Sequence, residues 1–153
     1  MDIQHKGTEI INDLILINND RMEGYTKALE NLRDESDNDL RSLFQHYIQQ
    51  ARQFNAELKP IVAIQGEEPS SGTKMSGKLH RLWLDVKSTF TGHDRRSILA
   101  ECERSEDASK KAYEDALNEV VDFPSDVANI IRSQAAQQKD AHNRIRDMRD
   151  STL

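Results

Sequence analysis

The chain has 153 residues, of which 31% are charged and 36% hydrophobic, and its formal net charge at pH 7 is −6. This length suits one domain with a sizeable core rather than two, and an aromatic content of 5% with three prolines disfavours a sheet-rich fold. The acidic balance disfavours nonspecific binding to nucleic acid or to a membrane surface.

Four long helices are predicted, because apolar residues recur at spacings of three and four along most of the chain. The first is expected over residues 8–34, and the polar run DESDND then supplies N-cap residues for the second, over residues 39–65. Pro60 indicates a kink or an early end of that helix. The third is expected over residues 94–121, and the fourth starts at Pro124 and runs to residue 150.

The connection between the second and third helices, residues 66–93, is far longer than the 2 to 8 residues that join antiparallel neighbours. A helix of about 27 residues is roughly 40 Å long, and this connection is long enough to return along it, so the second and third helices are expected to be parallel. One long crossover with two short turns is the ferritin-like arrangement. We therefore expect an all-α, ferritin-like four-helix bundle forming a single domain over residues 1–153.

The crossover segment is itself predicted to be partly helical, with one strongly apolar face. That face consists of Leu79, Leu82, Trp83, Val86 and Phe90. It is too apolar to remain in water, so it is expected to pack on its own bundle or on a partner, either a second copy of the chain or another protein. The acidic net charge makes a membrane the least favoured surface.

Several strings along the chain carry a resemblance to a known family. They are INNDRMEGY, RQFNAEL, GKLHRLWLDVKSTFTG, CERSEDASKKAYEDAL and AHNRIRDMRD. With these strings in this order, the chain resembles a family of bacterial ferritin-like four-helix-bundle proteins of uncharacterised function. The resemblance implies the ferritin-like fold and a bacterial source and suggests a link to stress response, but it supplies no catalytic residue.

A di-iron centre in such a bundle takes a Glu from each of two helices and a Glu-x-x-His from each of the other two. Glu106 and His142 lie on inward faces and fit two of these positions. Lys139, however, stands three residues before His142, and an ammonium group has no lone pair for a metal. Gln50 and Gln53 stand on the second helix where a carboxylate and an imidazole are required. We therefore expect neither a ferroxidase nor an oxygen-activating centre.

A hydrogen-bonded polar layer is the favoured interpretation of these inward-facing residues. An isolated buried carboxylate is strongly disfavoured, so Glu106 needs a partner such as Arg21, Tyr25 or His142. The expected members of this layer, or of a vestigial metal site, are Asn18, Arg21, Tyr25, Gln50, Glu106, Gln138 and His142. The alternative is one iron or other divalent metal ion, held weakly by Glu106, His142 and water.

Three further features bear on function. Cys102 has carboxylates beside it, which disfavour a thiolate, so it is expected to be a core residue rather than a nucleophile. Acidic residues interleave with the arginines of the last helix, as in the pair Asp140 and Arg144, which favours a solvated face over a nucleic-acid-binding stripe. The opening MDIQHKGTEI lacks the features of a signal peptide, so a cytoplasmic protein is expected.

Taken as a hypothesis about function, these features favour a noncatalytic binding or structural module without a cofactor. The alternative is a metal-binding ferritin-like protein with a degenerate iron site and redox activity. The two hypotheses differ in whether the inward-facing polar residues hold a metal ion.

Overall fold

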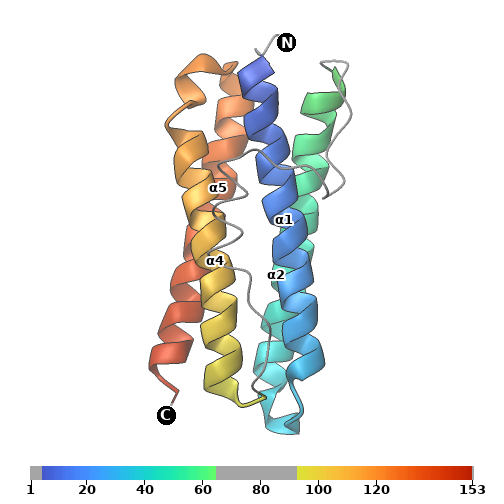
Figure 1. The fold of residues 1–153 in the computed structure, drawn as a ribbon, viewed down its shortest axis with the longest axis vertical. Helices are drawn as coiled ribbons and strands as arrows, with labels where there is room; N and C mark the ends of the chain where they lie inside the picture. The colour runs from blue at the N-terminus through green and yellow to red at the C-terminus, as the bar shows by residue number, and fades with distance from the viewer. Residues whose placement is uncertain (1–4, 65–92, 153) are drawn as a thin grey trace.

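The computed structural model describes residues 5–64 and 93–152, and four long α-helices account for most of them, labelled as in Figure 1. They are α1 (His5–Asn31), α2 (Asn38–Ile64), α4 (Arg95–Leu117) and α5 (Ser125–Asp150). Two short 3-10 turns, Glu35–Asp37 and Val120–Asp122, precede α2 and α5. The four predicted helices are confirmed, and their ends lie within about one turn of the predicted positions.

Local signals in the sequence account for the helix ends. The Asp94 side chain caps α4 by accepting a hydrogen bond from the backbone N–H of Ser97 at 3.1 Å. Pro124 immediately precedes α5. Pro60 does not end α2, which continues to Ile64. The carbonyl four residues earlier belongs to Ala56 on the exposed face, where water can replace the N–H that proline lacks.

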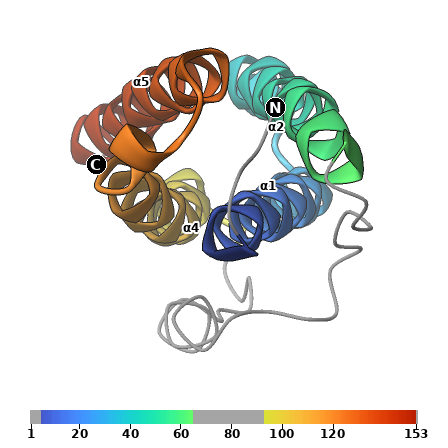
Figure 2. The same cartoon turned by 90° about the horizontal axis from the view of Figure 1, so that it is seen from above.

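The four helices form two antiparallel hairpins, α1–α2 and α4–α5, arranged around a common core (Figure 2). α2 and α4 run in the same direction, and α1 packs against α4 (Figure 1). The parallel arrangement predicted from the long connection is therefore confirmed. The predicted crossover helix and its apolar face of Leu79, Leu82, Trp83, Val86 and Phe90 lie outside the described residues.

The buried apolar residues form two clusters that follow each other along the bundle. One includes Ile11, Leu14 and Ile17 of α1 with Phe54, Leu58 and Tyr113, and the other includes Tyr25, Phe44 and Ile98. Between the two clusters, α1, α4 and α5 carry buried polar residues, and α2 carries the partly buried Gln50. Within the described ranges, no helix is long and apolar enough to cross a lipid bilayer.

An ion-pair cluster ties the two hairpins together at one end of the bundle. Arg95, the first residue of α4, pairs with Asp37 at 3.0 Å and with both carboxylate oxygens of Asp39 at 2.9 and 2.7 Å. Both aspartates lie at the turn from α1 into α2. This set of three residues, the Arg95 clasp, fixes the start of α4 beside that turn.

Candidate functional site

One polar residue from each of the four helices meets in the gap between the two apolar clusters. Arg21 of α1 donates from Nε and Nη2 to the two carboxylate oxygens of Glu106 of α4, at 2.5 and 3.0 Å. The same Nη2 donates to Oε1 of Gln50 of α2 at 2.8 Å, and Nε2 of Gln138 of α5 donates to the backbone carbonyl of Glu106 at 2.9 Å. We call these four residues the four-helix polar layer.

The negative charge of Glu106 and three neighbouring aromatic rings favour the charged form of Arg21 in this layer. The side chains of Arg21 and Glu106 are both fully buried. Burial lowers the pKa of Arg21, but the Glu106 carboxylate and its hydrogen bond raise it more, so the net shift is upward. The guanidinium carbon also lies 5.9, 5.5 and 6.0 Å from the ring centroids of Tyr25, Tyr47 and Phe54.

The layer takes one side chain from each of the four helices, as the ligand set of a di-iron bundle also does. Both oxygens of Glu106 accept hydrogen bonds from the Arg21 guanidinium, which supplies the positive charge that metal ions supply in a di-iron centre. Gln50 contributes a neutral amide from α2, and its carbonyl oxygen is used by the same guanidinium. A di-iron centre requires carboxylates and histidines from the four helices, and this layer holds an Arg–Glu pair and two amides instead.

A second set of buried side chains is joined by hydrogen bonds through the Tyr113 hydroxyl, and we call this set the Tyr113 chain. Asn18 donates to the Tyr113 hydroxyl at 3.0 Å, and that hydroxyl donates to Oε1 of Gln134 at 2.7 Å. Gln134 in turn donates to the backbone carbonyl of Phe54 at 3.1 Å and to Glu57 at 2.9 Å. Burial raises the pKa of the Tyr113 hydroxyl, so it remains a neutral donor near neutral pH.

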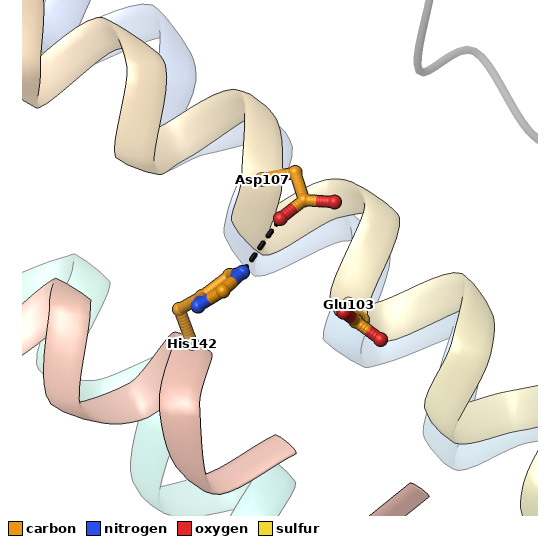
Figure 3. A group of neighbouring side chains, drawn as sticks. All are labelled: Glu103, Asp107 and His142. Carbon is orange, nitrogen blue, oxygen red and sulfur yellow. Dashed lines mark hydrogen bonds and ion pairs between the residues drawn. The ribbon is translucent and has the colours of Figure 1, made fainter. Parts of the chain in front are cut away.

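His142 belongs to a different group of side chains, drawn in Figure 3. Its ring extends from α5 toward α4, and Nε2 lies 2.6 Å from Oδ1 of Asp107. Glu103 lies one turn before Asp107 on α4, and one ligand atom from each of the three residues lies within 4.8 Å of the others. We call Glu103, Asp107 and His142 the α4–α5 cluster.

The members of the α4–α5 cluster differ in exposure and in their other partners. The His142 side chain is 6% exposed, whereas that of Asp107 is 50% exposed. Nδ1 of His142 lies 3.2 Å from Oδ1 of Asn143. Oε2 of Glu103 pairs with Arg149 of α5. The cluster thus combines a buried imidazole and a largely buried Glu103, whose side chain is 12% exposed, with an Asp107 that is open to solvent.

The structure distributes the seven predicted polar residues over several environments. It brings Arg21, Gln50, Glu106 and Gln138 into one layer, and it places Asn18 in the Tyr113 chain. Tyr25 stacks beside Arg21, and its hydroxyl has no hydrogen-bond partner among the described residues.

The predicted metal pair, Glu106 and His142, is not brought into one ligand group. Glu106 faces Arg21, and His142 faces Asp107.

Sequence reasoning missed Glu103, Asp107, Tyr113 and Gln134 as members of these polar groups. A signal for the first two was present, since carboxylates four residues apart share one face of a helix. Tyr113 and Gln134 lie on apolar stripes, and their spacing gave no indication that they bond to each other.

The seam between α4 and α5 also contains a cavity of about 300 Å³. Its lining includes three cationic side chains, Lys110, Arg132 and Lys139, and one carboxylate, Glu114, which lies 3.9 Å from the Lys110 ammonium group. Tyr113 and Gln138 are among the other residues. This volume is at the lower end of the range for small-molecule pockets.

Comparisons with known proteins agree with this architecture. A solved structure of a point mutant of Dps1 from Mycobacterium smegmatis superposes with a TM-score of 0.78 at 12% sequence identity, covering 95% of this chain and 98% of that chain. This likeness confirms the ferritin-like fold. None of the curated proteins matches the chain. The family model described as a domain of unknown function, DUF2383, matches residues 6–119, and the chain therefore belongs to the DUF2383 family.

Proposed function

We propose that this protein is a noncatalytic ferritin-like bundle that acts as a binding or structural module rather than as an iron oxidase. The observation that carries the proposal is the Arg21–Glu106 pair in the four-helix polar layer. A di-iron centre needs anionic oxygens that converge on two metal ions, and here the converging charge is already neutralised by a guanidinium.

Energetic arguments support the same proposal. Binding a metal ion at Glu106 would displace Arg21, leaving a fully buried cation without its carboxylate. Removing one partner of a buried ion pair costs about 3–5 kcal/mol. This cost argues against a degenerate iron site at Glu106 and His142, because the binding free energy of a weak two-ligand site is too small to offset it.

The cavity at the α4–α5 seam supports the binding side of the proposal. Its lining carries three cationic side chains and one carboxylate, so it has a net positive charge on a chain whose overall charge is negative. A small ligand with an anionic group would find complementary charge there.

Aerobic iron oxidation tests the noncatalytic proposal. We expect Fe²⁺ to be oxidised at the same rate with the protein as in buffer alone, measured by absorbance of the ferric product. Glu106→Gln should leave that rate unchanged, as should the surface control Glu114→Gln. Oxidation that is clearly faster with the native protein, and that Glu106→Gln alone abolishes, would contradict the proposal.

A further inference from the structure

We propose that Glu103, Asp107 and His142 bind one divalent transition-metal ion at the α4–α5 seam, outside the four-helix polar layer. This inference goes beyond the noncatalytic role proposed above and does not depend on it. The site would join two neighbouring helices through an exchangeable ion, rather than enclose a metal pair at the centre of the bundle.

The arrangement of the three side chains is the first argument. Glu103 and Asp107 are four residues apart and lie on one face of α4, and His142 reaches that face from α5 (Figure 3). Metal bonds of about 2.0–2.2 Å in a tetrahedral site place ligand atoms roughly 3.3 Å apart. The three ligand atoms already lie within 4.8 Å of one another, so shifts of side chains suffice to close the site.

The orientation of the imidazole is the second argument. A histidine that binds a metal through one ring nitrogen usually donates a hydrogen bond from the other. In this structure Nε2 of His142 points at the carboxylates, and Nδ1 lies 3.2 Å from Oδ1 of Asn143. With Nδ1–H donated to Asn143, the Nε2 lone pair would be directed at an ion placed between His142 and Asp107.

The exposure of Asp107 allows the ion to enter, whereas Glu103 is largely buried. The Asp107 side chain is half exposed, so it can move from its 2.6 Å contact with His142 to the longer separation that a shared ion requires. Glu103 pairs with Arg149 through Oε2, and its other oxygen remains for the metal. Arg149 competes with the ion for Glu103, and this competition is expected to weaken binding.

The ligand types indicate which ion the site would take. One imidazole nitrogen with two carboxylate oxygens suits Zn²⁺, Co²⁺, Fe²⁺ or Mn²⁺ better than Ca²⁺, which prefers six to eight oxygen ligands. Three protein ligands leave a coordination position for water. Zn²⁺ and Co²⁺ are the practical probes, because Co²⁺ reports its coordination through its visible absorption.

Titration of the full chain with Co²⁺ and Zn²⁺, followed by absorbance and calorimetry, tests the inference. We expect one equivalent to bind, and Asp107→Asn and His142→Gln each to weaken binding at least tenfold. Arg149→Gln removes the competing cation and should tighten binding severalfold. The matched control is His46→Gln, which removes an exposed histidine from α2 and should leave the affinity unchanged.

Two results would overturn the inference. One is the absence of binding by the native chain at millimolar metal. The other is binding that persists at full affinity in Asp107→Asn, whose half-exposed position makes a folded variant expected, with folding checked by circular dichroism. Because Glu106 lies in the separate Arg21 pair, neither result bears on the iron-oxidation test.

Discussion

Arg21 and Glu106 are oppositely charged side chains without solvent exposure, so their contribution to stability depends on both being present. Desolvation of two charges offsets much of their attraction, and a buried pair can be exchanged for apolar residues with little loss. Removal of one partner is different, because the remaining charge is buried and unpaired.

Substitutions at this pair are predicted to be strongly non-additive. Glu106→Leu should lower the free energy of unfolding by about 4 kcal/mol, and Glu106→Gln by less, because the amide oxygen still accepts from Arg21. The double variant Arg21→Met, Glu106→Leu should recover to within about 1 kcal/mol of the native chain. Chemical denaturation measures all three. A leucine variant as stable as the glutamine variant would show that the carboxylate has no part in a buried network.

Asp20 provides a prediction about pH. Burial, followed by repulsion from Glu23, raises the pKa of the Asp20 carboxyl from 3.8 to about 7. The folded state therefore favours the protonated form, so the carboxylate is destabilising above pH 7 and this penalty disappears as the pH falls toward 4. Asp20→Asn should raise the free energy of unfolding at pH 8 by about 1 kcal/mol, allowing for solvent screening at a half-buried position.

Denaturation of Asp20→Asn at pH 8 and at pH 4 checks this prediction. The gain should be present at pH 8 and absent at pH 4. Glu30→Gln, an exposed substitution on the same helix, should show no such pH dependence. An equal effect of Asp20→Asn at both pH values would contradict the assignment.

At the residue scale, the sequence predicted which side chains point inward better than it predicted their partners. Helical spacing places Arg21, Gln50, Glu106 and Gln138 on buried stripes, and the structure brings them together. The same spacing does not determine the axial position or the rotation of one helix relative to another. Glu106 therefore meets Arg21 rather than His142. His142 meets Asp107, whose four-residue spacing from Glu103 marks a shared helix face but does not identify the histidine as its partner.

At the scale of elements, the Arg95 clasp holds the start of α4 against the turn between α1 and α2. Asp37 is nearly buried, with its side chain 8% exposed, while Arg95 and Asp39 are more open to solvent. The hydrogen bonds from Arg95 lower the pKa of Asp39. The clasp thus links two elements that are separated in sequence by the long crossover.

Removal of the clasp is predicted to have a moderate, salt-dependent effect. Arg95→Gln should lower the free energy of unfolding by about 1 kcal/mol at pH 7 and low ionic strength, and by less at high salt. Because the pKa of Asp39 is lowered in the folded state, this contribution is present above the ordinary aspartate pKa and is lost as the pH falls through the lowered value. Arg104→Gln, in the exposed part of α4, is the matched control. A loss independent of salt would indicate packing rather than charge.

The ends of the elements were predictable where a capping residue marked them and less so elsewhere. The third helix is predicted to begin at Asp94, and in the structure that residue is the N-cap of α4, one position before its first residue. The other end of α4 is Leu117, four residues earlier than the predicted end at residue 121, and a 3-10 turn follows at Val120–Asp122. Apolar periodicity continues through this turn, since Val120 is buried, so spacing alone did not reveal that the α-helix had ended.

At the scale of the whole molecule, the length of one connection was enough to predict the topology. A segment of 28 residues between the second and third helices allows the chain to return along the bundle, and α2 and α4 are parallel as expected. The short connections between α1 and α2 and between α4 and α5 account for the two antiparallel hairpins. What covers the apolar face of the crossover remains a prediction.

Fluorescence of Trp83, the only tryptophan, tests that prediction. The apolar face to which it belongs is expected to pack on its own bundle, so its emission should be blue-shifted, independent of protein concentration and unaffected by anionic vesicles. Emission that reddens on dilution, with a halving of the mass in light scattering, would indicate a homodimer instead. A blue shift that depends on vesicles would indicate a membrane surface.

The position of the buried ion pair between the hairpins has a consequence for their register. Sliding α4 along α1 by one helical turn, about 5.4 Å, would separate Arg21 from Glu106 and bury both charges among apolar groups. The aliphatic contacts on either side of the pair distinguish less between alternative alignments of the helices, because one leucine or alanine can replace another against the facing helix. The pair therefore specifies one alignment of the two hairpins. Its replacement by apolar residues is expected to preserve stability while allowing more than one alignment.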